Sequence, residues 1–372
     1  MRKMQNSTVP RQKSGHRNEE KMSWENNVRR VEPYVPGEQP KTEQVIKLNT
    51  NECPYPPAPG VAKAAKEMDT DALRLYPDPN ASVLVDALAD YYHVKSSQVF
   101  VGVGSDDVLS IAFLTFFNSD KPILFPDITY SFYDVWAEVY RIPYETIPLD
   151  ENFQLRVEDY NRENGGIVIA NPNAPTGLFM PVEKIENIIK NNPDSIVIVD
   201  EAYVDFGAES CLPLTEKYDN VLVVQTFSKS RAMAGARIGF ALGSEKLIGY
   251  MNDVKFSINS YTMNRPSLLL GVEAVKDDAY FHHIVGKMIK TREWVKKELN
   301  LLGFTFPDSY SNFIFAKHKE KTAEELFNYL KDKNIYVRYF HKPRIDNYLR
   351  ISIGTDEQMQ ALVDALKEYL GC

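Results

Sequence analysis

Two runs, IVIVDEAY at residues 196–203 and VLVVQTFSK at residues 221–229, give the clearest indication of the fold class. Each begins with an almost continuous series of valine and isoleucine and ends in polar or charged side chains. Strands buried on both faces of a mostly parallel sheet have this pattern, whereas strands with one exposed face alternate apolar and polar residues. The runs therefore predict buried strands with reactive side chains near their carboxyl ends.

The same pattern extends outward along the chain in both directions. Further apolar runs are VFVG (99–102), ILF (123–125), IVIA (167–170) and IGFAL (238–242). Helical patterns lie between several runs, at residues 106–117 and at residues 181–190, where Pro181 suits the first helical position. Strand–helix alternation over about 140 residues indicates an α/β domain.

The C-terminal third has a different pattern. Residues 266–302 are predicted to be mainly helical and residues 312–318 to form a strand, while residues 335–340 and 348–354 alternate with period two. A closing helix begins at Thr355, with Gln358 completing a capping box. This third predicts a smaller α+β unit.

Composition excludes several classes of protein. The chain has 372 residues, 44% hydrophobic and 25% charged, which is ordinary for a folded protein of about two structural units. No run approaches the roughly 20 apolar residues of a membrane helix. The net charge of −8 argues against a general nucleic-acid-binding surface.

Cysteine and histidine usage points to a reduced, metal-free protein. Three scattered cysteines form no disulfide framework, which predicts a cytoplasmic location, and the six histidines fit no metal site. Residues 1–22 are polar and basic, without the apolar stretch of a secretory signal, and predict a disordered tail.

Lys229 has a neighbourhood that suggests chemistry. Ser228 precedes it, and AGARIG (234–239) brings Arg237 eight residues later. A hydroxyl and a guanidinium beside a lysine suit a phosphate-bearing cofactor whose reactive group condenses with that lysine. Without those neighbours, a lysine at a strand end is usually a surface residue.

Two other strand ends carry polar side chains. Asp200 and Tyr203 lie in DEAY (200–203), and Asn171 opens NPNAPTG (171–177). Asp200 could serve only as a helix cap, and NPNAPTG could be only a tight loop. Alternatively, Asp200 keeps a ring nitrogen protonated, because ligands of α/β sheets bind beyond the carboxyl ends of the strands.

GVGSDD (102–107) predicts an anion site. Gly102 and Gly104 permit close approach of the backbone, and the amides of Ser105 and Asp106 begin a helix. A dinucleotide-binding fingerprint would need glycine where this chain has Asp107, which argues against a dehydrogenase.

Together these motifs resemble a known family. PDITYSFY with Tyr130, NPNAPTG, DEAY, and TFSK followed by AGARIG have the order and spacing of the fold-type I pyridoxal-phosphate aminotransferases, over about residues 31–372. The resemblance implies an α/β large domain with a mostly parallel seven-stranded sheet (residues 71–265). It also implies a small α+β domain made of residues 23–70 and 266–372.

The resemblance also implies a cofactor, pyridoxal 5′-phosphate, and roles for the motif residues. Lys229 would bind the cofactor covalently and act as a general base, and Asp200 would pair with the pyridinium. Tyr203 and Asn171 would contact the phenolic oxygen, and Tyr130 would stack on the ring. The phosphate would be held by Ser228, Arg237 and the amides of Ser105 and Asp106.

The N-terminal part resembles the histidinol-phosphate aminotransferase family in YVPGEQPK (34–41), KLNTNECPYPP (47–57) and LRLYPDP (73–79). This implies transamination between histidinol phosphate and 2-oxoglutarate in histidine biosynthesis. It also implies a homodimer, in which Tyr76 reaches the cofactor phosphate of the neighbouring subunit. Departures from the family pattern are Cys53, Pro57 and SRAMAG (230–235).

Two strand arginines have open roles. Arg338 and Arg350 each point away from the apolar face of a predicted strand, which by itself indicates solvent-facing side chains. The resemblance implies instead that Arg350 binds the substrate α-carboxylate with its planar fork. Arg338, with Tyr55 and Asn51, would bind the distal phosphate.

Three alternatives stay open. A threonine-phosphate decarboxylase and an aromatic amino-acid aminotransferase share this fold, and a ligand-binding or regulatory protein could be built on it. The intact set of Lys229, Asp200 and Arg237 argues against the last.

Overall fold

The computed structural model describes residues 24–35, 37–40 and 45–371. They divide into two units, one ending at Glu32 and one beginning at Pro33. The described part of the first unit contains the 3₁₀ helix η1 (Trp24–Asn27). The predicted tail, residues 1–22, lies outside the described residues. No helix in the described ranges is long and apolar enough to cross a membrane.

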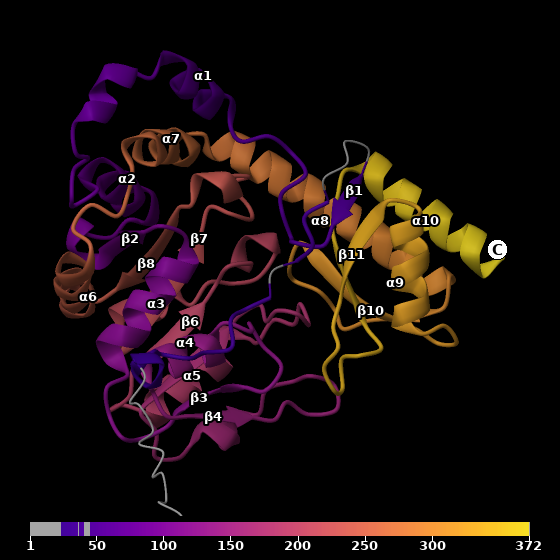
Figure 1. The fold of residues 1–372 in the computed structure, drawn as a ribbon, viewed down its shortest axis with the longest axis horizontal. Helices are drawn as coiled ribbons and strands as arrows, with labels where there is room; N and C mark the ends of the chain where they lie inside the picture. The colour runs from indigo at the N-terminus through magenta and orange to yellow at the C-terminus, as the bar shows by residue number, and fades with distance from the viewer. Residues whose placement is uncertain (1–23, 36, 41–44, 372) are drawn as a thin grey trace, which may run out of the picture. The chain divides into compact units, whose positions relative to one another are not determined.

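A seven-stranded sheet organises the second unit (Figure 1), in the order β2-β8-β7-β6-β5-β3-β4. Its strands are β2 (Val99–Gly102), β3 (Ile123–Pro126), β4 (Tyr144–Ile147), β5 (Gly166–Ala170), β6 (Val197–Asp200), β7 (Val221–Thr226) and β8 (Gly239–Gly243). Only β8 runs antiparallel to its neighbours. The predicted mostly parallel sheet is therefore confirmed. The edge strand β4 was not predicted because three of its four residues are exposed, so it lacks a continuous apolar run.

Helices bury both faces of this sheet. Along β6, Val197 and Val199 belong to one apolar core and Ile198 to the other. The first core includes α2 (Ser82–Tyr92), α5 (Val182–Asn191) and α7 (Arg265–Lys276); the second includes α3 (Ser105–Phe116), α4 (Tyr133–Tyr140) and α6 (Glu245–Ile258). The other helical elements of this part of the chain are α1 (Pro59–Glu67), η2 (Thr70–Arg74), η3 (Ser96–Gln98), η4 (Val157–Tyr160), η5 (Val204–Phe206), η6 (Leu212–Glu216) and η7 (Ala234–Ala236).

A second sheet joins the two ends of the chain in the order β1-β11-β12-β10-β9. Its strands are β1 (Ile46–Leu48), β9 (Phe304–Thr305), β10 (Phe313–His318), β11 (Ile335–Tyr339) and β12 (Leu349–Ser352). The helices α8 (Asp278–Leu301), α9 (Ala323–Asp332) and α10 (Asp356–Leu370) share its core. The predicted capping box at Thr355 is confirmed. Because β1 pairs with β11, the segment that follows β1 is attached to this sheet.

Two details differ from the sequence-based expectations. Pro181 is the N-cap of α5 rather than its first helical residue. The buried side chains of α7, such as Leu268 and Ala274, pack in the core of the seven-stranded sheet, although residues 266–372 were assigned to the small domain. The domain boundaries themselves stay a prediction.

The contact between β8 and the start of α3 leaves no room for a side chain at Gly239. An added Cβ would lie 2.2 Å from Ser105 N and 2.3 Å from Gly104 C, both backbone atoms. Gly239→Ala should therefore cost about 1–3 kcal/mol of unfolding free energy and lower the melting temperature. Gly235→Ala is the matched control, because nothing lies within 4 Å of its added Cβ. Equal melting temperatures for both variants in thermal unfolding would contradict this packing.

Candidate active site

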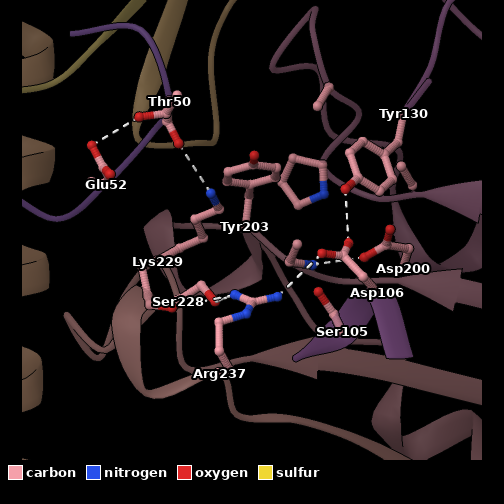
Figure 2. A pocket seen from close by; sticks show the side chains of 15 residues that line it. Thr50, Glu52, Ser105, Asp106, Tyr130, Asp200, Tyr203, Ser228, Lys229 and Arg237 are labelled. Atoms are coloured by element: carbon pink, nitrogen blue, oxygen red, sulfur yellow. Dashed lines mark hydrogen bonds and ion pairs between the residues drawn. The ribbon is translucent and has the colours of Figure 1, made fainter. Parts of the chain in front are cut away.

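A cavity of about 180 Å³ opens beyond the carboxyl ends of β5, β6 and β7. Asp200 ends β6 in register with Ala170 of β5 and Val224 of β7, so these strand ends lie at one level. The cavity brings together most of the predicted site residues (Figure 2): Ser105, Asp106, Tyr130, Asp200, Tyr203, Ser228, Lys229 and Arg237.

Asp200 is a buried carboxylate that accepts hydrogen bonds from two uncharged donors. Its Oδ2 accepts a hydrogen bond from the Tyr133 hydroxyl at 2.8 Å, and its Oδ1 accepts one from Ala202 N at 3.2 Å. The side chain is 5% exposed, and this burial raises the pKa of Asp200 to about 6, although both hydrogen bonds act to lower it. A cationic group in the cavity would offset the cost of burying this charge.

Lys229 follows β7 and reaches the cavity from the opposite side (Figure 2). Its Nζ donates a hydrogen bond to the Thr50 carbonyl at 3.2 Å and lies 5.8 Å from the centroid of the Tyr203 ring. Thr50 follows β1 of the second sheet, and Tyr203 follows β6 of the seven-stranded sheet. The Lys229 amine therefore lies near segments that come from both sheets.

The start of α3 forms an end of the cavity that is rich in donors. Arg237 Nη1 lies 3.4 Å from Ser228 Oγ, and its Nη2 lies 3.2 Å from Asp106 Oδ2. Asp106 Oδ1 also accepts the Tyr130 hydroxyl at 2.8 Å. The Asp106 side chain therefore fixes Arg237 and Tyr130, whereas the sequence suggested a role only for its backbone amide. Gly104 has a φ of +87°, which favours glycine, and a Cβ there would lie 2.4 Å from Arg237 Nη2 and displace the guanidinium.

Asn171 is not brought into the cavity. Its amide is 1% exposed and makes two hydrogen bonds with the backbone of Met180, at 2.9 Å and 2.8 Å. These two bonds use one of the two N–H donors of the amide, so the expected contact with a phenolic oxygen stays a prediction. From the same loop, Pro172 and Ala174 line the cavity instead.

Arg338 and Arg350 lie directly opposite each other across β11 and β12. Val337 and Leu349 face the helix-covered core, so both arginines lie on the other face of the sheet. Arg350 Nη2 donates to Asn49 O at 3.0 Å, and its buried Nε has no hydrogen-bond partner among the described residues. Burial lowers the pKa of Arg350. Neither arginine is among the residues that line the cavity.

The three other predicted site residues lie apart from the cavity lining. Asn51 Nδ2 donates to the Tyr203 hydroxyl at 2.9 Å, and so contacts the site through that tyrosine. Tyr55 packs at the core of the second sheet under Lys287. Tyr76 is 78% exposed and its ring stacks on Tyr261 with centroids 4.6 Å apart.

Three polar side chains of the site were not predicted from the sequence: Thr50, Glu52 and Tyr133. Thr50 and Glu52 lie in KLNTNECPYPP, where the family resemblance implies roles only for Asn51 and Tyr55. Tyr133 lies in PDITYSFY, but nothing in that motif indicates which of its tyrosines reaches Asp200.

The donor set fits pyridoxal 5′-phosphate. Ser228, Arg237 and the amides at the start of α3 offer hydrogen bonds to a phosphate. Asp200 is a buried anion suited to a protonated ring nitrogen, and Lys229 places an amine in the same cavity. Tyr130 adds a flat aromatic ring to the cavity lining, and Ala202 adds a small side chain.

The sequence matches the family Aminotransferase class I and II over residues 43–366, and the chain therefore belongs to that family. A histidinol-phosphate aminotransferase of Lactococcus lactis subsp. cremoris (strain MG1363) is 53% identical, over 94% of this chain and 98% of its own. One from Clostridium botulinum (strain Langeland / NCTC 10281 / Type F) is 51% identical, over 93% and 98%. At this identity and coverage, the particular family is that of the histidinol-phosphate aminotransferases, which confirms the resemblance.

A solved structure has the same fold. The histidinol-phosphate aminotransferase from Sinorhizobium meliloti, in complex with pyridoxal-5′-phosphate, superposes with a TM-score of 0.80 at 24% identity. The match covers 88% of this chain and 91% of that one.

The burial of Asp200 predicts a pH-dependent stability. Because its folded pKa of about 6 exceeds the ordinary 3.8, the folded cofactor-free chain holds this proton more tightly than the unfolded chain. The contribution of Asp200 to the free energy of unfolding therefore falls as pH rises between about 4 and 6, by up to about 3 kcal/mol, and this loss persists above pH 6.

Asp200→Asn abolishes that titration. We compare the melting temperatures of the two cofactor-free proteins. The melting temperature of the variant minus that of wild type should rise between about pH 4 and 6 and stay constant above pH 6. Asp90→Asn, at an exposed carboxylate, is the control. A gap independent of pH would contradict the raised pKa.

Proposed function

We propose that this chain transfers the amino group of histidinol phosphate to 2-oxoglutarate, giving imidazole acetol phosphate and glutamate in histidine biosynthesis. The observation that carries the proposal is that one fold joins two sets of residues: the cavity of Lys229 and Asp200, and the opposed pair Arg338 and Arg350. The first set suits amine chemistry on a pyridoxal cofactor, and the second suits an anionic substrate.

In this proposal the cofactor is pyridoxal 5′-phosphate. Ser228, Arg237 and the α3 amides hold its phosphate, Asp200 its ring nitrogen, and Lys229 its carbonyl carbon. When bound, it supplies an aldehyde that condenses with amines and a ring that accepts electrons. Tyr203, fixed by the Asn51 amide, remains the candidate partner of the phenolic oxygen.

Lys229 Nζ is the group that moves the proton. Its contact with the Thr50 carbonyl directs the amine into the cavity, and a neutral amine there can take the proton of the substrate α-carbon. Asp200 stays ionised when a cation faces it, because an adjacent opposite charge lowers the pKa of a carboxyl. The Tyr133 hydroxyl orients Asp200 and stabilises its charge.

The arginine pair provides substrate recognition. Two guanidinium groups on opposed positions of β11 and β12 can both contact one anion, because directly opposite side chains begin about 5 Å apart. We assign the phosphate of histidinol phosphate mainly to Arg338 and a substrate carboxylate to Arg350. The unpartnered Nε of Arg350 supports an anion at this position.

We also propose a cytoplasmic homodimer. Tyr76 stacks on Tyr261, and Leu73 and Leu75 precede it in the chain. All four side chains are exposed, which supports burial of this surface against a second copy of the chain. The unpaired thiols of Cys53 and Cys211 support a reducing compartment.

The direct test supplies the protein with pyridoxal phosphate, histidinol phosphate and 2-oxoglutarate. We expect formation of glutamate that depends on 2-oxoglutarate. Lys229→Ala should lose both the activity and the adduct trapped by borohydride. Release of carbon dioxide from threonine phosphate without 2-oxoglutarate would favour the decarboxylase. Turnover of phenylalanine as fast as histidinol phosphate would favour the aromatic aminotransferase.

The arginine assignment predicts opposite effects in the two half-reactions. Histidinol phosphate has no carboxylate, whereas glutamate has two, so Arg350→Ala should slow the glutamate half-reaction more. Arg338→Ala should slow the histidinol-phosphate half-reaction more, by roughly ten- to a hundredfold if a charge-assisted bond is worth about 1.5–3 kcal/mol. Single-turnover kinetics measure both, with Arg162→Ala, a surface arginine paired with Glu145, as control. Equal losses in both half-reactions would refute the assignment.

A further inference from the structure

Successive residues of the segment that follows β1 contact different parts of the site. The Asn49 carbonyl accepts a hydrogen bond from Arg350, and the next carbonyl, of Thr50, accepts one from Lys229. The Glu52 side chain then lines the cavity (Figure 2). One short segment therefore contacts the anion-binding arginine, the reactive lysine and the cavity wall.

Glu52 is a carboxylate with one oxygen engaged and one available. Its Oε2 accepts the Thr50 hydroxyl at 2.8 Å and pairs with the Lys47 ammonium. Burial raises the pKa of Glu52, but these hydrogen bonds outweigh burial and hold the pKa below its ordinary value. The side chain is 43% exposed, and both of these bonds use Oε2, which leaves Oε1 able to accept another donor.

Resting on the proposed function, we infer that Glu52 determines specificity by accepting a hydrogen bond from the imidazole N–H of histidinol phosphate. The amine-bearing carbon of this substrate lies between two arms, one ending in phosphate and one in imidazole. With the phosphate held mainly by Arg338 and the α-carbon at Lys229, we place the ring on the Glu52 side of the cavity.

The chemistry of the two substrates makes this contact selective. A neutral imidazole has one N–H donor and an imidazolium has two, so either form can donate to an ionised carboxylate. The corresponding arm of glutamate ends in a carboxylate, which has no donor for Glu52. Lys47 partly neutralises Glu52, and this limits the repulsion that glutamate would otherwise meet.

The test compares Glu52→Gln with wild type in single-turnover half-reactions on the cofactor-loaded enzyme. Glutamine keeps the size of the side chain and an acceptor oxygen, but it removes the charge. We expect kcat/KM for histidinol phosphate to fall at least tenfold. The rates with glutamate and with an amino-alcohol phosphate that lacks the ring should stay within about twofold of wild type.

Lys47→Met is the matched control, because it breaks the same ion pair from the other side and leaves Glu52 charged. This variant should keep the preference for the ring-bearing substrate. Cofactor absorbance and the melting temperature, measured for both variants, report that each is folded and loaded.

Two results would overturn the inference. Equal losses with the ring-bearing and ring-free phosphates would mean that Glu52 only supports the Lys47–Thr50 contact, and no loss would mean that it does not recognise the ring. Both presuppose a wild-type enzyme that turns over histidinol phosphate. Absence of that turnover would instead refute the proposed function, so the two failures are distinguishable.

Discussion

The site depends on one constraint, the burial of the Asp200 carboxylate at the end of β6 without a charged donor. A hydroxyl and a backbone amide hold its oxygens, and its pKa nevertheless rises to about 6. Such a group is costly until a cation faces it, so the folded chain is prepared for a cationic ring. The parallel register of β5, β6 and β7 then brings Lys229 to the same cavity as this anion.

The second sheet supplies what the first lacks. Its β11–β12 pair carries the two opposed arginines, and the segment after β1 connects Arg350, through Asn49, with Lys229, through Thr50. A substrate bound there bridges residues from both sheets. This arrangement separates two tasks physically, because the residues proposed to hold the cofactor lie mainly on the first sheet, and those proposed to recognise the substrate lie on the second.

The sequence predicted those features that depend on local pattern. Continuous apolar runs predict the buried strands. The positions of Lys229 and Asp200 can then be predicted, because the carboxyl ends of parallel strands lie at the same edge of the sheet. Contacts between distant segments were not predictable: Tyr133 reaches Asp200 across 67 positions, and Thr50 reaches Lys229 across 179. The contact of the Asn171 side chain with the Met180 backbone was likewise not predictable from the sequence.

The pairing of the two chain ends in the second sheet has a consequence for biosynthesis. Asn49 and Arg350 are in hydrogen-bond contact although 301 residues separate them. At roughly 5–20 residues per second, a ribosome needs on the order of 15–60 s between these two residues. During that interval β1 has no partner strand, and its exposed backbone edge is open to chaperones or to pairing with another nascent chain. The recognition surface can therefore form only after translation is nearly complete, whereas the central strands can begin to assemble earlier.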